Sequence, residues 1–281
     1  MEYKNLYEKG KKQLCEAGIE EADLNARLLL EYVCGTDRNT LLAHGDREVS
    51  GKECSLYESC IAKRENHIPL QHITGEQEFM GLKFTVNENV LIPRQDTEIL
   101  VEEVLRDLHD GMSILDMCTG SGCILLSLMH YSNDCEGTGV DISGKALQTA
   151  QENADRFSEH PAPVFLKSDL FEKVEGKYDI IVSNPPYIPT GVIPTLMKEV
   201  REYEPIEALD GKEDGLFFYR EIVKQAGAHL NRGGKIFFEI GYDQAKEVSE
   251  LLEDAGYREV EVVKDFAGLD RVVFGTYLPK A

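Results

Sequence analysis

Metal-binding and disulfide patterns are missing from this sequence of 281 residues. Its seven cysteines, an odd number, form no Cys-x-x-Cys pair, and its seven histidines form no His-x-x-x-His or His-Glu-x-x-His pattern. A disulfide framework calls for an even set of cysteines, and a zinc site calls for closely spaced pairs of ligands. We therefore expect reduced, mostly buried thiols and no bound metal.

Long apolar runs are also missing. No stretch of about 18 apolar residues occurs, which is the shortest that indicates a transmembrane helix. No charged-then-apolar leader follows Met1, so the pattern of a secretory signal is absent too. We expect a cytoplasmic protein that does not bind membranes.

Basic residues are scarce. The chain has 30 Lys and Arg against 51 Asp and Glu, a formal net charge of −21. Nucleic-acid binding draws much of its affinity from basic side chains that neutralise phosphates, so a local basic patch would act against the field of the whole chain. The charge is explained either by a solvated acidic surface or by a basic partner, and we expect no nucleic-acid partner.

The first part of the chain carries the apolar period of helices. The length allows a large domain and a smaller one, and we expect a helical domain over residues 1–68. Residues 69–92 change to a pattern that predicts a hairpin linker. The helical period is carried by Leu6, Leu14, Ala17, Ala22, Ala26, Leu29, Leu30 and Val33.

From residue 93 to 281 predicted strands alternate with predicted helices. This order is typical of an α/β domain with a doubly wound, mainly parallel sheet, in which ligands bind beyond the carboxyl ends of the strands. The loops after the strands are therefore where chemistry is expected. The predicted strands are Ser113–Asp116, Gly137–Val140, Pro163–Leu166, Tyr178–Val182, Lys235–Glu239, Val260–Val263 and Arg271–Phe274.

Two of these loops indicate a nucleotide-like ligand. Glycines after the first strand let backbone approach a ligand closely, although the loop Cys118-Thr119-Gly120-Ser121-Gly122 is neither a Walker loop nor Gly-x-Gly-x-x-Gly. Asp141 follows the second strand about 20 residues later, where a carboxylate accepts hydrogen bonds from ribose hydroxyls. Asp141 could instead cap the next helix, but Ser143 already suits that role. NAD and S-adenosylmethionine both remain open here.

Two later loops separate these cofactors. Asp169 and Leu170 follow the third strand, where a carboxylate can reach an adenine amino group. The fourth strand leads into Asn184-Pro185-Pro186-Tyr187. Consecutive prolines fix φ and lack N–H donors, so this corner is stiff and its carbonyls are left as acceptors.

At these loops the chain resembles the class I S-adenosylmethionine-dependent methyltransferases that carry an Asn-Pro-Pro-Tyr motif. The resemblance implies a Rossmann-like doubly wound sheet, with the glycine loop at the methionine moiety, Asp141 at the ribose and Asp169 at the adenine. Cofactor contacts are expected from Cys118, Thr119, Gly120, Ser121, Gly122, Asp141, Asp169, Leu170 and Asn184.

The motif suits a nitrogen with a delocalised lone pair. The Asn184 side-chain oxygen and the Pro185 carbonyl can each accept one hydrogen of an NH₂ group, which stabilises the positive charge that develops as nitrogen attacks the methyl. Tyr187 can stack on the planar group, and placement in line with the sulfonium supplies proximity. The catalytic residues are thus expected to be Asn184, Pro185 and Tyr187, with Pro186 added for substrate binding.

Further segments are similar to the release-factor glutamine methyltransferases. That family implies methylation of the side-chain nitrogen of the glutamine in the Gly-Gly-Gln motif of class 1 peptide chain release factors, with a helical domain that helps to grip the factor. We expect a monomer. Adenine-N6 nucleic-acid methyltransferases and enzymes that methylate a ribosomal-protein glutamine remain alternatives. The resemblance rests on Pro69–Gly75, Leu91–Glu98, Glu204-Pro205, Asp214-Gly215, Glu239-Ile240-Gly241 and Asp265–Gly268.

Some positions depart from the family pattern or allow two interpretations. Cys118 stands where Gly is common, and Gln95 where Pro is common. Arg94, Asp96 and Glu98 either shape the pocket or begin a helix, since acidic residues favour a first turn. A structural role is expected for Glu239 and Gln244 near the sheet edge, and a turn for Asp265–Arg271.

Overall fold

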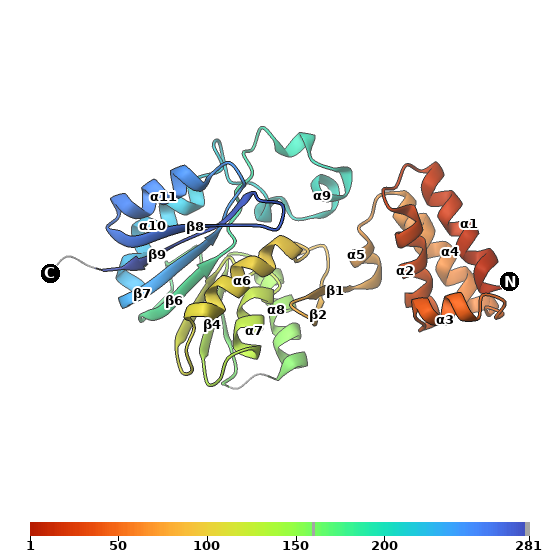
Figure 1. Ribbon diagram of the computed structural model, residues 1–281, viewed down its shortest axis with the longest axis horizontal. Coiled ribbons are helices and arrows are strands. Elements are labelled where there is room, and N and C mark those ends of the chain that lie inside the picture. Colours follow the sequence, from red (N-terminus) through yellow and green to blue (C-terminus); the bar gives the residue numbers. More distant parts are fainter. Residues whose placement is uncertain (159–160, 279–281) are drawn as a thin grey trace. The chain divides into compact units, whose positions relative to one another are not determined.

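Two units of the chain each bury an apolar core of their own in the computed structural model, which describes residues 1–158 and 161–278 (Figure 1). The helical unit comprises Met1–Glu76 and Met197–Tyr203, and the sheet unit comprises Gln77–Leu196 and the chain from Glu204 onward. The division therefore falls after Glu76 and not after residue 68, and the expected linker 69–92 is split between the units.

The split of residues 69–92 follows from the side chains that this segment buries. The short helix α5 (Leu70–Thr74) contacts α2 (Ala22–Cys34) and α4 (Gly51–Glu65), and its Ile73 lies in the core of the helical unit. Phe79 and Phe84, from the two strands β1 (Glu76–Phe79) and β2 (Leu82–Thr85) of a hairpin, lie instead in a core cluster of the sheet unit. Each half of the segment thus belongs to the unit that buries its apolar side chains.

The helices of the first unit begin and end at recognisable signals. A capping box begins α4, where Ser50 accepts from the Glu53 N–H and the Glu53 carboxylate accepts from the Ser50 N–H. Gly35 ends α2 in the left-handed conformation. The helices are α1 (Tyr3–Glu16), α2 (Ala22–Cys34), α3 (Arg38–Ala43), α4 (Gly51–Glu65), α5 (Leu70–Thr74) and the distant α9 (Lys198–Tyr203).

A buried arginine joins α9 to the helical unit. Nε of Arg64 donates to Oδ1 of Asn25 at 2.8 Å, and Nη2 of Arg64 lies 2.7 Å from Oε2 of Glu199. The hydroxyl of Tyr203 donates to the carbonyl of Asn66 at 2.8 Å. Because a buried guanidinium needs a partner, Glu199 explains why a segment more than a hundred residues away joins this core.

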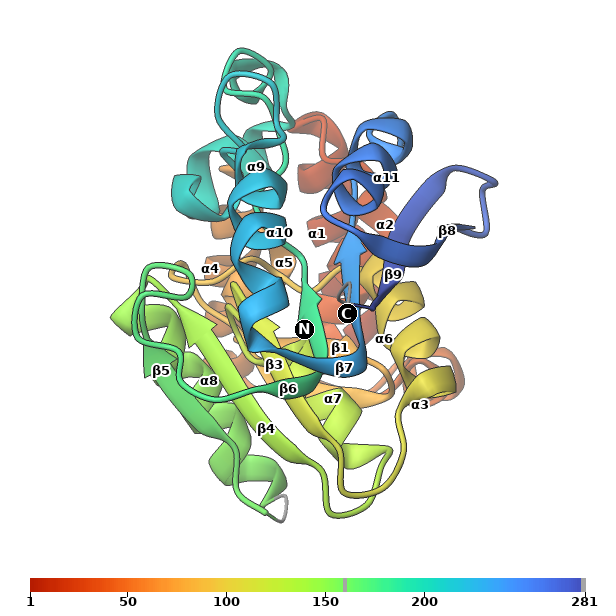
Figure 2. The same cartoon turned by 90° about the vertical axis from the view of Figure 1, so that its left-hand side faces the viewer.

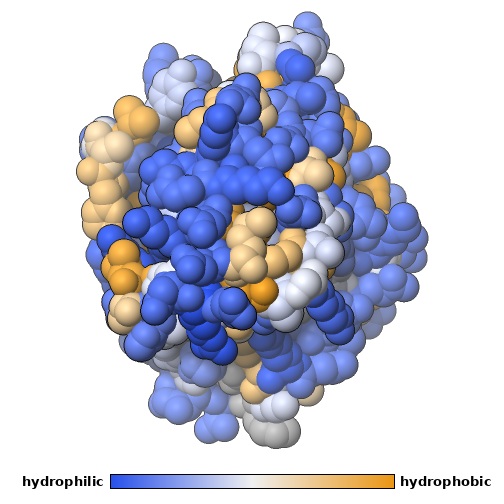
Figure 3. Space-filling view, turned by 90° about the vertical axis from the view of Figure 1, so that its right-hand side faces the viewer, coloured by the Kyte–Doolittle hydropathy of each residue, from blue (hydrophilic) through white to orange (hydrophobic). Residues whose placement is uncertain are grey.

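The surface of the protein is mainly polar where Figure 3 shows it, with apolar side chains in small patches. Leu42, the most exposed large apolar side chain of the helical unit among the described residues, is 75% exposed. Among the described residues, no helix has both the length and the apolar character needed to cross a bilayer.

All seven cysteines are free thiols, but only Cys60, Cys123 and Cys135 are buried, fewer than expected.

A seven-stranded sheet in the order β5-β4-β3-β6-β7-β9-β8 organises the second unit (Figure 2). The pairs from β5 to β7 are parallel, and β9 is antiparallel to both β7 and β8, so the expectation of a mainly parallel sheet is confirmed. Strand β7 begins at Leu230, ahead of the predicted Lys235. The strands are β3 (Ser113–Met117), β4 (Glu136–Asp141), β5 (Val164–Lys167), β6 (Tyr178–Ser183), β7 (Leu230–Glu239), β8 (Tyr257–Lys264) and β9 (Asp270–Tyr277), besides the hairpin β1 (Glu76–Phe79) and β2 (Leu82–Thr85).

Helices cover both faces of this sheet. On one face α6 and α7 share a core cluster with the hairpin and α8, and on the other face α10 and α11 share a second cluster. The strand register sets Met117 beside both Val140 and Ser183, so the loops after β3, β4 and β6 leave the sheet at one edge. These helices are α6 (Gln95–Asp107), α7 (Cys123–His130), α8 (Gly144–Phe157), α10 (Phe217–His229) and α11 (Ala245–Asp254), with short turns η1 (Ile193–Thr195) and η2 (Ile206–Ala208).

Candidate active site

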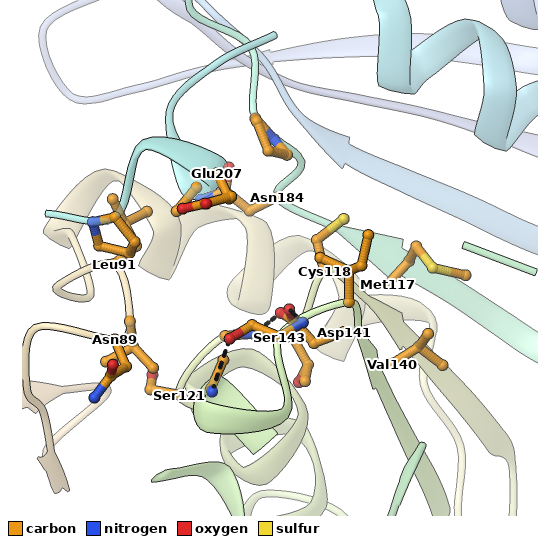
Figure 4. A pocket seen from close by; sticks show the side chains of 18 of the residues that line it. Asn89, Leu91, Met117, Cys118, Ser121, Val140, Asp141, Ser143, Asn184 and Glu207 are labelled. Atoms are coloured by element: carbon orange, nitrogen blue, oxygen red, sulfur yellow. Dashed lines mark hydrogen bonds between the residues drawn. The ribbon is translucent and has the colours of Figure 1, made fainter. Parts of the chain in front are cut away.

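A cavity of about 790 Å³ lies at the carboxyl ends of the parallel strands, and its size is that of a small-molecule site. Figure 4 shows Asn184 and Glu207 on one side of it and Asp141 and Ser143 on the other. Most of the residues expected from the sequence meet here. They are Cys118, Thr119, Gly120, Ser121, Asp141, Asp169, Leu170, Asn184 and Pro186.

Three expected residues are not part of the described cavity lining. Gly122 begins α7 in the left-handed conformation, and a Cβ there would lie 3.2 Å from Ala150 of α8. Its role is therefore close packing of two helices. Pro185 is buried beside the lining, and the hydroxyl of Tyr187 is directed to Glu239.

The glycine loop after β3 depends on left-handed backbone. Cys118 has φ of 63° and Gly120 has φ of 55°. A side chain in this conformation destabilises the folded state by about 1–2 kcal/mol, so a glycine would be less strained than Cys118 at this position. The Thr119 hydroxyl donates to Oδ2 of Asp116 at 2.6 Å, and burial raises the pKa of Asp116 to about 7. The loop is thus anchored to the end of its own strand.

The carboxylate of Asp141 is held by backbone donors. Oδ2 accepts from the Gly120 N–H at 2.9 Å and Oδ1 accepts from the Ser143 N–H at 2.8 Å. Burial raises the pKa of Asp141, and these N–H donors act in the opposite direction. Ser143 itself caps α8 by accepting from the Ala146 N–H at 3.2 Å. Asp141 is therefore free of the capping role and faces the cavity.

The corner Asn184–Tyr187 is supported from behind by side chains of distant segments. Nδ2 of Asn184 donates to Oγ1 of Thr97 at 3.3 Å. The Tyr187 hydroxyl donates to Oε1 of Glu239 at 3.4 Å, and Nε2 of Gln244 donates to the Tyr187 carbonyl at 3.0 Å. Burial is the main cause that raises the pKa of Tyr187. The motif is thus tied to α6, β7 and the start of α11.

The expected location of Glu239 and Gln244 near a sheet edge needs correction, whereas nothing contradicts a structural role. Strand β7 is internal to the sheet, and Glu239 lies at its carboxyl end, next to the end of β6. Both side chains contact the Asn-Pro-Pro-Tyr corner itself. A sequence signal existed, because a polar residue at the carboxyl end of a predicted parallel strand lies at the ligand-binding edge.

The segment before and at the start of α6 divides between the two interpretations left open by the sequence. Arg94 lines the cavity and forms an ion pair with Glu204. Glu98 instead accepts from the Met80 N–H at 2.7 Å and so holds the hairpin. Asp96 lies 3.2 Å from Nη2 of Arg271.

The turn between β8 and β9 has the structural role that the sequence indicated. Oδ1 of Asp265 accepts from the N–H groups of Ala267 and Leu269, each at 2.9 Å. Oδ2 of Asp265 lies 3.0 Å from Nη2 of Arg271. The turn is therefore closed by one carboxylate.

A metal centre has no basis in the described residues, because no group of three or more Cys, His, Asp or Glu side chains there could hold an ion. The cavity instead offers hydroxyl, carboxylate and amide groups on a mainly apolar wall. This mixture suits an organic ligand with several polar groups.

Comparisons with known proteins cover both units. Residues 5–75 match the family model described as PrmC N-terminal domain, and residues 94–199 match the one described as Methyltransferase small domain. The release factor glutamine methyltransferase of Clostridium botulinum is 43% identical over 275 residues, which cover 96% of this chain and 97% of that protein. The enzyme of the same name from Geobacter sulfurreducens is 43% identical over 264 residues, 93% of this chain and 92% of its own.

The fold also has counterparts among solved structures. A methyltransferase from Pyrococcus furiosus aligns with a TM-score of 0.54 and 21% identity, covering 80% of this chain and 96% of that one. Together with the matching family model, this likeness shows that the sheet unit has the class I S-adenosylmethionine-dependent methyltransferase fold. The fold class expected from the sequence is therefore confirmed.

Proposed function

Because this chain belongs to the release factor glutamine methyltransferase family, we propose that it methylates the side-chain nitrogen, N5, of the glutamine in the Gly-Gly-Gln motif of class 1 peptide chain release factors. The methyl donor is S-adenosylmethionine. One observation carries the proposal. Asn184, the expected acceptor for the carboxamide, lines the same cavity as Gly120 and Asp141.

The cavity has the groups that S-adenosylmethionine requires. Oγ of Ser121 is buried in its wall without a hydrogen-bond partner among the described residues, so a ligand can supply one. A Cβ at Gly120 would meet nothing within 4 Å, which leaves room for a ligand beside the backbone. The glycine loop would hold the methionine moiety, Asp141 the ribose hydroxyls, and Asp169 with Leu170 the adenine. When bound, the cofactor supplies an electrophilic methyl group on sulfur.

The protein's own part in the reaction is to orient a poor nucleophile. The amide oxygen of Asn184 and the carbonyl of Pro185 accept the two N–H bonds of the substrate carboxamide. As nitrogen attacks, it becomes positively charged, and these two acceptors stabilise that charge. The attacked nitrogen is then acidic enough to lose its proton without a strong base. Pro186 lines the cavity and Tyr187 lies outside its described lining, and in this proposal both help to keep water from the planar group.

The rival substrates lack such support. An adenine methyltransferase acting on nucleic acid needs basic groups along the phosphates, and the formal net charge of this chain is −21. The relatives that match over more than 90% of the chain carry the name of release-factor enzymes and not of ribosomal-protein enzymes.

We extend the proposal to the setting of the reaction. The protein acts as a monomer in the cytoplasm, without nucleic acid or membrane, and its helical unit grips the release factor. Support comes from the acidic charge and from the separate core of that unit. Light scattering of the purified protein measures its mass, and a dimer would contradict the monomer.

Mass spectrometry of the Gly-Gly-Gln peptide tests the main proposal. A purified class 1 release factor incubated with this protein and S-adenosylmethionine is expected to gain one methyl group on that glutamine. A factor whose glutamine is replaced by alanine is the matched control and should gain none. Equal labelling of both factors, or labelling of DNA or RNA in place of protein, would contradict the proposal.

A substitution behind Tyr187 is expected to slow the reaction. Gly215 has φ of 75°, and a Cβ there would lie 2.7 Å from Nε2 of Gln244 and against the Tyr187 carbonyl. Gly215→Ala should displace Tyr187 and lower kcat about tenfold, because small misplacements near the chemistry are costly.

Gly176→Ala is the matched control for Gly215→Ala. Gly176 also has positive φ, 83°, but a Cβ there would meet nothing within 4 Å. Gly176→Ala should lose about 1–2 kcal/mol of unfolding free energy from the strained backbone, and Gly215→Ala should lose more because its Cβ also overlaps Tyr187 and Gln244. Only Gly215→Ala should lose activity, and equal activities of the two variants would show that the contact with Tyr187 is unimportant.

A further inference from the structure

We propose that Thr97 and Glu239 are positioning residues that fix which way the Asn184 side-chain amide faces. Through them the oxygen of Asn184, and not its nitrogen, is presented to the methyl acceptor. The inference rests on the proposed function, in which that oxygen accepts an N–H of the substrate carboxamide.

An amide side chain needs such a device because its two ends have nearly the same shape. If its terminal amide group were rotated by 180°, Asn184 would present to the substrate an NH₂ group, which has two donors and no acceptor. Two NH₂ groups facing each other repel, so the turned form would bind the carboxamide poorly. The shape of the pocket alone does not discriminate between the two forms.

The neighbours of Asn184 do discriminate. Its Nδ2 donates to Oγ1 of Thr97 at 3.3 Å, and the Thr97 hydroxyl is near enough to the Glu239 carboxyl to lower the pKa of that group. Thr97 and Glu239 are each only 2% exposed, so water does not compete for these contacts.

The direction of the chain of hydrogen bonds follows from counting protons. An ionised carboxylate can only accept, and a threonine hydroxyl has one proton to donate. If that proton goes to Glu239, Oγ1 of Thr97 is left as an acceptor toward Asn184. An acceptor attracts the amide nitrogen and repels the amide oxygen, so the oxygen faces the cavity.

Glu239 has an acceptor available for this proton. Its Oε1 accepts from the Tyr187 hydroxyl at 3.4 Å, whereas its Oε2 is buried and has no hydrogen-bond partner among the described residues, so it is free to accept the Thr97 proton. An unsatisfied buried carboxylate oxygen is costly to keep. A role in orienting Asn184 accounts for its presence.

The protonation state of Glu239 therefore controls the arrangement. Burial raises its pKa to about 7. Once protonated, Glu239 can donate to Thr97, which then donates its own proton toward Asn184 and attracts the amide oxygen. The rate should thus rise as pH rises through about 7. The groups that act on Glu239 are Thr97 and Asp96 of α6, Cys123 of α7, Tyr187, Tyr219 of α10 and Arg271 of β9.

Variants of Thr97 test the proposal by separating kcat from cofactor binding. Thr97→Val keeps the shape but removes the hydroxyl, and we expect kcat for release-factor methylation to fall about tenfold, the loss of roughly one good hydrogen bond. The Kd for S-adenosylmethionine should stay close to that of the wild type. Thr97→Ser restores the hydroxyl and should recover most of the rate.

Thr276→Val is the matched control. Thr276 is also buried and its hydroxyl donates to a carboxylate, Oε2 of Glu259, at 3.1 Å, but it pairs with Lys235, four residues before Glu239 on β7, and is not part of the described cavity lining. This variant should keep the wild-type kcat. A Thr97→Val enzyme with normal kcat, or a Thr97→Ser enzyme as slow as Thr97→Val, would overturn the proposal.

Glu239→Gln is an independent test through the pH profile. At saturating cofactor the wild-type kcat should rise through about pH 7, and the variant should be slower and lack that rise. Persistence of the rise in Glu239→Gln overturns the role of Glu239. A wild-type enzyme that methylates the release factor while these variants behave normally overturns only this inference, whereas an inactive wild type overturns the proposed function as well.

Discussion

Replacing Asn184 with alanine is expected to lower kcat by about 10²–10³-fold, the usual loss when one preorganised group at a developing charge is removed. The variant loses the oxygen that accepts an N–H of the substrate. It keeps Gly120 and Asp141, so the Kd for S-adenosylmethionine should change little. Single-turnover methylation of a release factor, with calorimetric titration of the cofactor, measures the two quantities.

Asn133→Ala provides the matched control for Asn184→Ala. Asn133 is an exposed asparagine of the same unit whose Nδ2 donates to Oδ1 of Asp110 at 3.2 Å, outside the cavity. It should retain full kcat. If Asn184→Ala were as active as this control, the corner would be a scaffold, and a protein that only docks the release factor would become the better interpretation.

Replacing Asp141 with asparagine is expected to weaken cofactor binding and spare the chemical step. The carboxylate is oriented by the N–H groups of Gly120 and Ser143 and faces the cavity. Hydrogen bonds to a charged group contribute about 1.5–3 kcal/mol each, so the Kd for S-adenosylmethionine should rise about 100-fold. At saturating cofactor, kcat should approach that of the wild type.

Asp155→Asn is the corresponding control, because Asp155 is an exposed carboxylate of α8 that contacts only Gln151 among the described hydrogen bonds. Its Kd should equal that of the wild type. An Asp141→Asn protein with unchanged affinity would place the ribose elsewhere. If the Asp141→Asn protein bound S-adenosylmethionine normally but did not methylate the release factor, Asp141 would have a catalytic role and not a role in cofactor binding.

The two substitutions have opposite signatures. Asn184→Ala should change kcat at constant affinity, and Asp141→Asn should change affinity at nearly constant kcat. If both variants lost both kcat and affinity for S-adenosylmethionine, the result would instead indicate that either substitution disrupts all the loops at this edge of the sheet.

Local patterns in the sequence determined most of the fold and the residues of the cavity. Alternating strands and helices indicated a parallel sheet, and the carboxyl ends of such strands meet at one edge. The glycine loop, Asp141 and the Asn184 corner each follow a strand directly, so the sequence alone predicts that they lie close together. The family resemblance indicated the positive φ of Cys118, because that family pattern has glycine at this position.

Only the tertiary structure decided which distant side chains support that corner. Thr97 and Asn184 are 87 residues apart, and Glu239 and Gln244 follow the corner only after α9 and α10. The same holds for α9, which joins the helical unit because the buried Arg64 needs Glu199. Periodicity and motifs report the neighbours of a residue along the chain. Contacts between segments depend on strand register and on the pairing of buried charges, which no local pattern records.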